Sequence, residues 1–307
     1  SKNITFKQLW ELYFTHLEDS KSVAKRTYET KKSYYNAHFK NVFDNPDSFG
    51  GCHSDLTIDE IKFAICRGGW PASLNRKTPR AQLAIAKDLF NQTCNIDISN
   101  IDGVKRNPQW AKSILKSYAR NLCTLAETKT ILADINATCE MSRQSYYDYV
   151  SALEKLMIIE NVDAWGPAIR SKTSIRSSQK RNFIDPSIAT AAFGVSPEYF
   201  DKDYKTLGFL FESLCIRDLK IYSSNNDGYL SYYRDRLGLE ADAVLHLNDG
   251  RYALIEIKLG EYGVDEGAKH LCEIERLVRK KKKKERQNHL RIPDLKLVIT
   301  ATQFGYR

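Results

Sequence analysis

The spacing of apolar residues divides the chain into a helical first half and a second half in which helices and strands alternate. Apolar positions recur every three or four residues in 1–43, 79–97 and 107–126, a period typical of amphipathic helices. Beyond residue 228 the apolar runs shorten to the length of single strands. This pattern predicts an α/β protein, α+β overall, with the sheet in its C-terminal part.

Breaks in the pattern predict where the shorter elements end. A helix that begins at Leu56 is expected to stop at Arg67-Gly68-Gly69-Trp70-Pro71, because two glycines and a proline cannot continue it. Further helices are expected over Ile188–Phe193, Leu207–Tyr222 and the basic stretch 266–282. Strands are expected over Tyr229–Arg234 and Leu295–Ala301.

Residues 127–184 have the pattern of a winged helix-turn-helix. A helix over Thr128–Ile135 is followed by a turn, and Ser142 is placed to cap a second helix that reaches Met157. Two strands, Ile158–Val162 and Arg181–Ile184, would frame a basic wing over Ala168–Lys180. A second helix of this kind usually enters the major groove of DNA. The candidate contacts to bases or phosphates are Arg143, Gln144, Ser145, Arg170, Lys172 and Arg176. Docking of another protein is the alternative role for such a unit.

A hairpin from Glu240 to Gly260 places acidic residues among apolar ones. If Asn248-Asp249-Gly250 is a three-residue loop, Asp242 falls opposite Glu256, and Glu240 falls opposite Lys258. A two-residue loop would put Asp242 and Glu256 on opposite faces. Two opposed carboxylates repel each other unless a divalent cation such as Mg²⁺ or Mn²⁺ lies between them. The nearby Lys258 could then orient or deprotonate a water molecule, or neutralise a phosphate.

The acids and the Glu256-Ile257-Lys258 sequence resemble the PD-(D/E)XK nuclease superfamily. This resemblance implies a metal-dependent hydrolysis of phosphodiesters, in which Glu212 on the preceding helix completes the metal site formed by Asp242 and Glu256. Asp242, Glu256, Lys258 and Glu212 are therefore the candidate catalytic residues.

A longer resemblance covers residues 43–307. The motifs RGGWP, FIDPSIA, GFLFESL, YYRDRLGLEADAV and LIEIKLG follow one another as in the C-terminal region (domain of unknown function 4143) of prokaryotic AAA-type ATPases. The resemblance implies a helical region over 44–126, a winged helix over 127–184 and a nuclease-like domain with a mixed sheet over 185–307. The sequence has no GxxxxGK[ST] phosphate loop. The ATPase domain and a last strand after Arg307 are missing, so we expect a fragment or a gene fusion.

The N-terminal segment 1–43 carries a different resemblance. Its sequence TFKQLWELYFTHLEDSKSVAKRTYETKKSYYNAHFK is similar to the SAM-like core-binding helices of phage-type tyrosine recombinases. In that family these helices grip DNA, whereas the recombinase catalytic domain does not follow here.

The net charge of +9 is concentrated in one stretch, because residues 269–291 hold ten Lys or Arg and three Glu. Such a cluster favours polyanions. The residues expected to hold a phosphate backbone here are Arg234, Arg279, Lys280, Lys281, Lys282, Lys283, Lys284 and Arg286. Seven scattered cysteines without a CxxC pair indicate free thiols and a reducing cytoplasm. No run of 18 apolar residues is present, so no membrane partner is expected.

These features predict a DNA-associated protein with a metal-dependent endonuclease site. Its expected partners are double-stranded DNA and an AAA-type ATPase acting in trans. The alternative from another class is a non-catalytic module that binds DNA or docks a partner, or a remnant that has lost its chemistry.

Overall fold

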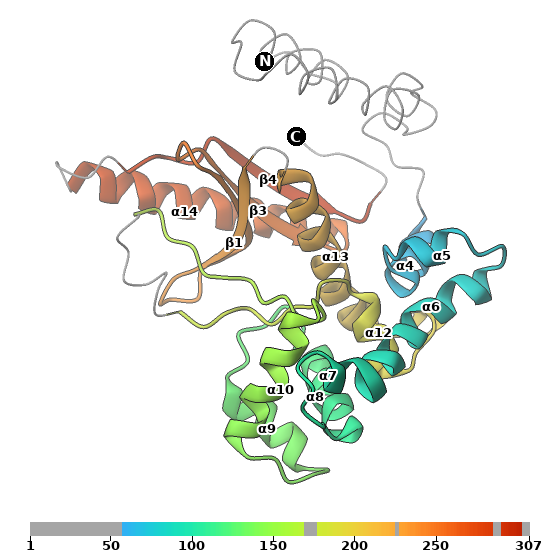
Figure 1. Cartoon of the computed structure of the whole chain (residues 1–307). Coiled ribbons are helices and arrows are strands. Elements are labelled where there is room, and N and C mark those ends of the chain that lie inside the picture. The colour runs from blue at the N-terminus through green and yellow to red at the C-terminus, as the bar shows by residue number, and fades with distance from the viewer. Residues whose placement is uncertain (1–56, 169–176, 225–226, 285–289, 303–307) are drawn as a thin grey trace, which may run out of the picture. The chain divides into compact units, whose positions relative to one another are not determined.

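A computed structural model of the chain describes residues 57–168, 177–224, 227–284 and 290–302, shown in colour in Figure 1. Within these limits, residues 58–301 form one compact unit. The helices expected in 1–43 lie outside the described residues. The predicted α/β class, α+β overall, is confirmed. The predicted boundaries near 126 and 184 stay predictions.

Helices make up the first part of the unit, and they lie together in Figure 1. Their bounds are α4 Ile58–Arg67, α5 Pro71–Leu74, α6 Pro79–Gln92, α7 Ile98–Asn100, α8 Pro108–Arg120, α9 Thr128–Asn136, α10 Arg143–Lys155 and α12 Ser187–Phe193. A single π-helical segment, Thr93–Asp97, joins α6 to α7, so the helix predicted over 79–97 is continuous but changes its winding.

The helix predicted over 107–126 is shorter than expected, because α8 ends at Arg120. The backbone N–H and the side chain of Asn121 both donate to the carbonyl oxygen of Ser117, at 3.1 and 2.9 Å, where the helix ends. Cys123 then has a positive φ of 57°, a conformation that a helix cannot contain.

The two helices predicted for the winged unit are confirmed as α9 and α10. Ser142 caps α10 by accepting a hydrogen bond from the backbone N–H of Ser145. The two strands predicted to frame the wing are reduced to isolated bridges, Ile159 with Phe183 and Val162 with Lys180. Most of the wing lies outside the described residues.

The C-terminal part is a four-stranded mixed sheet with a long helix on each face. Its elements are α13 Tyr204–Ser224, β1 Gly228–Arg234, β2 Glu240–Leu247, β3 Tyr252–Lys258, α14 Val264–Lys284 and β4 Leu295–Thr300, with short 3₁₀ segments over Pro197–Asp201 and Glu261–Gly263. The strands lie in the order β1-β2-β3-β4, with β1, β2 and β3 antiparallel and β4 parallel to β3.

Alternate residues of the strands pack into two different apolar clusters. Ala243, Ile255 and Ile257 join the large core that contains α13 and the N-terminal helices. Val244 and Leu254 point the other way and pack with Leu271, Ile274 and Val278 of α14. The free thiols expected from the sequence are confirmed for the described cysteines, Cys66, Cys94, Cys123, Cys139, Cys215 and Cys272.

The Gly68-Gly69-Trp70 turn joins the helical part to α12 and α13. The backbone N–H of Gly69 donates to Asp185 Oδ2 at 2.9 Å, and Trp70 Nε1 donates to Ser187 Oγ at 2.8 Å. Asp185 also accepts a 2.5 Å hydrogen bond from Arg217 of α13. The Gly68-Gly69-Trp70 turn and the Asp185-Pro186-Ser187 segment, far apart in sequence, therefore form one junction.

Gly68→Ala is expected to lower the free energy of unfolding by about 2–3 kcal/mol, measured by urea denaturation. Gly68 has a φ of +74°, and a Cβ atom there would lie 2.4 Å from Ser187 Oγ. The matched control is Gly103→Ala, because Gly103 has a φ of +73° but nothing within 4 Å of its Cβ position. An equal loss in the two variants would show that the close contact has no effect.

Candidate functional site at the β2–β3 hairpin

The predicted register of the hairpin is confirmed. Ala243 pairs with Ile255, Val244 with Leu254, and His246 with Tyr252, and Leu247 N donates to Arg251 O at 2.8 Å across the three-residue loop. Continued by one residue, this register places Asp242 opposite Glu256 on the same face of the sheet.

The two strands part at Asp242. In a regular continuation, the N–H of Ile257 would bond to the backbone of β2, but it donates instead to Asp242 Oδ2 at 2.8 Å. The carboxylate of Asp242 is thus fixed between the strands. The hydrogen bond positions this side chain beside Glu256 and Lys258.

Glu256 is a buried acid next to another acid. Its side chain is 2% exposed, and its Oε2 atom lies 2.5 Å from Lys258 Nζ, an ion pair. Oε2 is nevertheless buried without a hydrogen bond of acceptable geometry. Burial and the charge of Asp242 raise the pKa of Glu256 to about 8. Ionisation of Glu256 is therefore costly in spite of Lys258, because the carboxylate is buried and faces Asp242.

Lys258 contacts both of these acids, since its Nζ lies 3.6 Å from Asp242 Oδ2. Burial opposes its charged form, but Asp242 and Glu256 raise the pKa of Lys258 overall. The side chain is 28% exposed, so its ammonium group can reach both the acids and the solvent.

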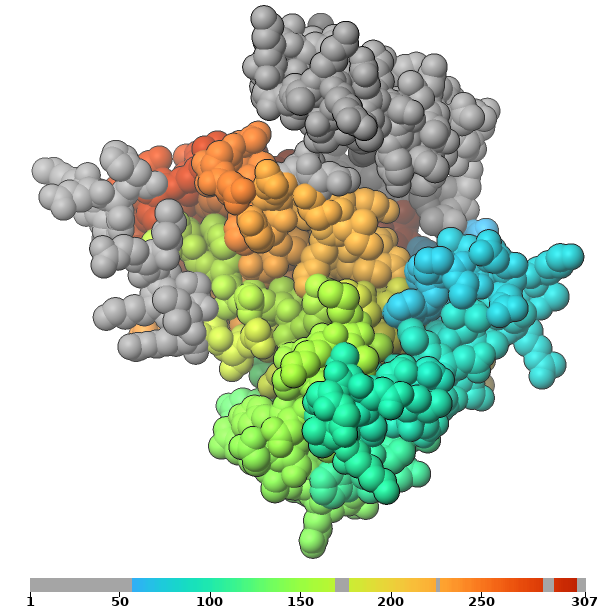
Figure 2. Space-filling view, in the orientation of Figure 1, coloured from blue at the N-terminus to red at the C-terminus, as the bar shows by residue number. Residues whose placement is uncertain are grey.

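Lys180 is the residue of this site that the sequence did not reveal. It is the last residue of the predicted basic wing, whereas its side chain is 1% exposed. Its Nζ lies 2.8 Å from Glu240 Oε1, 2.9 Å from Glu212 Oε1 and 3.9 Å from Asp242 Oδ1. Figure 2 shows the segment after α10, in lime green, beside the gold and orange atoms of the C-terminal part. The bridge between Val162 and Lys180 helps to bring this lysine to the acids.

Two sequence expectations for the acids change. Glu240 is not paired with Lys258, because its carboxylate binds Lys180 and also Arg234 Nη1 at 2.8 Å. Glu212 binds Lys180, so it does not converge with Asp242 and Glu256 as a third ligand. Burial raises the pKa of Glu212 to about 7, although Lys180 lowers it. Among the residues that the structure describes, no three acidic, histidine or cysteine side chains form a group able to hold a metal ion.

The remaining pair of acids fits a hard divalent cation. Mg²⁺ in proteins takes one or two carboxylates and completes its shell with water and phosphate oxygens. Asp242 and Glu256 supply two carboxylates, and Glu256 Oε2 is an acceptor without a good donor. The cluster has four acids (Glu212, Glu240, Asp242, Glu256) and three cations (Lys180, Lys258, Arg234), so its net charge is −1 when all are ionised. A single Mg²⁺ would change this net charge to +1, which favours a bound phosphate.

The start of α14 closes over this pair. A Cβ atom at Gly267 would lie 3.2 Å from Glu256 Cβ, and one at Gly263 would lie 3.0 Å from Lys258 Cδ. His270, one turn further on, places Nδ1 3.7 Å from Glu256 Oε1. Small residues at 263 and 267 therefore let the helix approach Glu256 and Lys258 closely.

The candidate nucleic-acid contacts lie in separate places. Arg143 and Gln144 are exposed at the start of α10, where the guanidinium of Arg143 lies over the ring of Tyr147 at 5.7 Å, and Ser145 is half-buried. Lys280–Lys283 are exposed on the last turns of α14, and Arg279 there pairs with Glu275. The side chains of Arg170, Lys172, Arg176, Lys284 and Arg286 lie outside the described residues.

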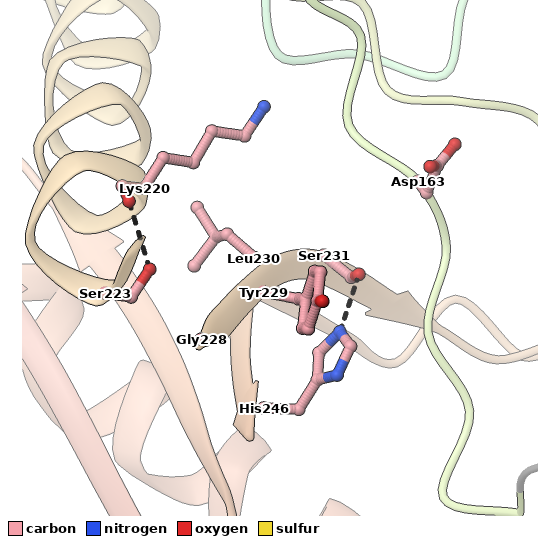
Figure 3. A pocket seen from close by; sticks show the side chains of 8 residues that line it. All are labelled: Asp163, Lys220, Ser223, Gly228, Tyr229, Leu230, Ser231 and His246. Carbon is pink, nitrogen blue, oxygen red and sulfur yellow. Dashed lines mark hydrogen bonds between the residues drawn. The ribbon is translucent and has the colours of Figure 1, made fainter. Parts of the chain in front are cut away.

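A separate cavity of about 380 Å³ lies beside β1, between Asp163 and the end of α13 (Figure 3). Ser231 and His246 share a 3.1 Å hydrogen bond there, and the ring of Tyr229 stacks on His246. Lys220 at its rim pairs with Glu160 at 3.1 Å. The main polar groups of this cavity are thus engaged with protein partners, and nothing in the lining identifies a ligand.

Two family models match different parts of the unit. Residues 58–199 match a domain of unknown function (DUF8612), and residues 207–304 match a domain of unknown function (DUF4143). The DUF4143 resemblance, expected over 43–307, is confirmed only for the segment from α13 to β4. No curated protein and no solved structure matches the chain. None of the described helices is long and apolar enough to span a membrane.

Proposed function

We propose that the chain is a DNA-associated protein that hydrolyses phosphodiester bonds with one Mg²⁺ or Mn²⁺ held by Asp242 and Glu256. The observation that carries this proposal is the pair of carboxylates, buried Glu256 and half-buried Asp242, that the hairpin register places opposite each other. Two such acids destabilise a sheet unless a cation compensates them. The resemblance of Asp242 and Glu256-Ile257-Lys258 to the PD-(D/E)XK nucleases supports the same chemistry.

Each residue has a distinct role in this proposal. The bound cation would polarise a phosphoryl oxygen and activate a water molecule. Asp242, fixed by the N–H of Ile257, keeps its carboxylate at the place where the strands part. Lys258 is exposed enough to meet the solvent and can orient a water or stabilise charge on the phosphate. Glu212 and Glu240 are engaged by Lys180 and act only as its partners.

The test is cleavage of supercoiled plasmid DNA by the whole chain in Mg²⁺, in Mn²⁺ and in a chelator. Nicking or linearisation that requires the metal and ceases with the chelator is the expected result. A chain that binds DNA but leaves it intact under all three conditions would exclude catalysis.

A second candidate function, DNA binding without cleavage, is favoured by the exposed lysines of α14. Their charges point to solvent, and this favours contact with a phosphate backbone. We expect Lys280→Ala with Lys282→Ala and Lys283→Ala to weaken DNA binding. The slope of log K against log salt, from fluorescence anisotropy, should become shallower by about 0.9 for each phosphate that the variant no longer neutralises.

An equal number of alanines at exposed Lys77, Lys105 and Lys116 is the matched control. If the control makes the slope as shallow as the α14 variant does, the basic end of α14 is not the binding surface.

A further inference from the structure

Lys180 is a cation built into the acidic cluster. Its ammonium contacts carboxylates from two elements, Glu212 of α13 and Glu240 of β2, at 2.9 and 2.8 Å. Ionised lysines are rarely buried to this degree, and burial alone would neutralise the group. The acids overcome that cost, and they raise the pKa of Lys180 overall. The pocket of acids is therefore arranged to hold a positive charge.

The backbone fixes this charge in place. Lys180 N and O both bond to Val162 at 2.9 Å, and its Nζ lies 5.6 Å from the centre of the Tyr232 ring. The ammonium reaches the acids from a segment that belongs neither to the sheet nor to α13. Its position depends on the fold of the whole unit and not on the hairpin alone.

Asp242 lies between two cation positions. Its Oδ1 faces Lys180 Nζ at 3.9 Å, while its Oδ2 faces Lys258 Nζ at 3.6 Å near Glu256. Two-metal hydrolytic sites place their ions about 3.5–4 Å apart. A shared acid between two cation positions is the arrangement that such a site needs. Here the buried Lys180 ammonium holds one position, and the partly exposed Lys258 lies beside Glu256 at the other.

We propose that the Lys180 ammonium takes the place of a second divalent ion, so that the site binds a single metal ion. The inference rests on the proposed metal site of Asp242 and Glu256. Lys180 is a positioning residue in this account, because it holds Glu212, Glu240 and Asp242 and does not reach the solvent. Without the ammonium, the negative charges of these three acids would lack their buried cation, and a second ion would be drawn to them.

The test counts the Mn²⁺ ions bound by the whole chain with isothermal titration calorimetry, in the wild type and in Lys180→Ala. The alanine removes the charge and leaves room for an ion with its water. We expect one Mn²⁺ in the wild type and two in the variant. Electron paramagnetic resonance should show two spin-coupled Mn²⁺ ions in the variant alone.

The matched control is Lys220→Ala. Lys220 lies on α13 and pairs with Glu160 at 3.1 Å, and its side chain is 22% exposed, but it does not contact the acidic cluster. This variant should bind one Mn²⁺. If it also gains an ion, the extra ion does not report on the position of Lys180, and the inference is overturned.

Each remaining outcome decides between the two proposals. A wild type that binds no Mn²⁺ overturns the proposed metal site itself. A wild type that binds two ions, or a Lys180→Ala variant that still binds one, overturns the role of Lys180 and leaves the proposed function standing. A variant that unfolds without metal and folds with Mn²⁺ supports the inference. One that stays unfolded in excess Mn²⁺ contradicts it, because the ion then cannot replace the ammonium.

Discussion

Glu256→Gln is expected to abolish metal-dependent cleavage and, at the same time, to stabilise the metal-free protein. The variant loses one of the two proposed carboxylate ligands, and we expect the cleavage rate to fall at least about 100-fold. The neutral amide also removes a buried negative charge that faces Asp242. At a pH above the raised pKa of Glu256, about 8, the free energy of unfolding in a chelator should therefore rise, on the order of 2 kcal/mol.

Opposite changes in activity and stability distinguish a functional site from a structural ion pair. If Glu256 served only to hold Lys258, its loss would destabilise the chain, because Lys258 would keep only its longer contact with Asp242. Plasmid cleavage and urea denaturation in a chelator measure the two effects separately.

Glu266→Gln is the matched control for this prediction. Glu266 lies on α14 near the site, but its side chain is 73% exposed, and we expect neither cleavage nor stability to change. Wild-type cleavage by Glu256→Gln would exclude this residue from the proposed metal site. A loss of stability in the metal-free variant would favour a structural ion pair instead.

The hairpin was predictable from sequence because its information is local. The Asn248-Asp249-Gly250 loop sets the register, and the register alone places Asp242 opposite Glu256. The helices α9, α10 and α13 were predictable for the same reason, since their apolar period and the Ser142 cap lie within each segment. The end of α8 could not be predicted, because the apolar pattern continues to Ala126, whereas the helix ends where Asn121 bonds to Ser117.

Lys180 could not be placed from sequence because its partners are distant along the chain. A lysine within a Ser-, Thr- and Arg-containing stretch has the local pattern of a solvated wing. Its burial comes from the bridge to Val162 and from the acids of α13 and β2, which only the tertiary fold brings together. The same tertiary contact withdraws Glu212 from the predicted set of metal ligands. A local pattern thus identified the acids and missed the charge that compensates them.

The metal-free protein is expected to lose stability as the pH rises from about 6.5 to about 8, and Mg²⁺ should cancel this loss. Burial raises the pKa of Glu212 to about 7 and that of Glu256 to about 8, both above the ordinary value of 4.5. Over this range the folded state therefore binds more protons than the unfolded state. The contribution of each acid is complete below the ordinary value of 4.5, declines above it, and is lost once the pH reaches the folded-state pKa.

The other titrating groups do not mask this effect below about pH 8. Burial raises the pKa of four cysteine thiols, so they add a decline of the same sign only above that pH. Acids with a lowered pKa, such as Asp102 at about 2, have lost their protons well below this range. Burial lowers the pKa of His246, so its contribution has the opposite sign but lies below about pH 6.5. Each pH unit between a folded and an unfolded pKa corresponds to about 1.4 kcal/mol, so two such acids give an effect that urea denaturation can measure.

The experiment compares urea unfolding across this pH range in a chelator and in millimolar Mg²⁺. A bound cation replaces the protons as the compensating charge, so the stability in Mg²⁺ should stay level or rise with pH. Glu256→Gln in a chelator should show a shallower decline than the wild type, because only Glu212 then remains to titrate. If the metal-free wild type gains stability between about pH 6.5 and about pH 8, the two acids are compensated without a metal ion, and the case for a cation between Asp242 and Glu256 fails.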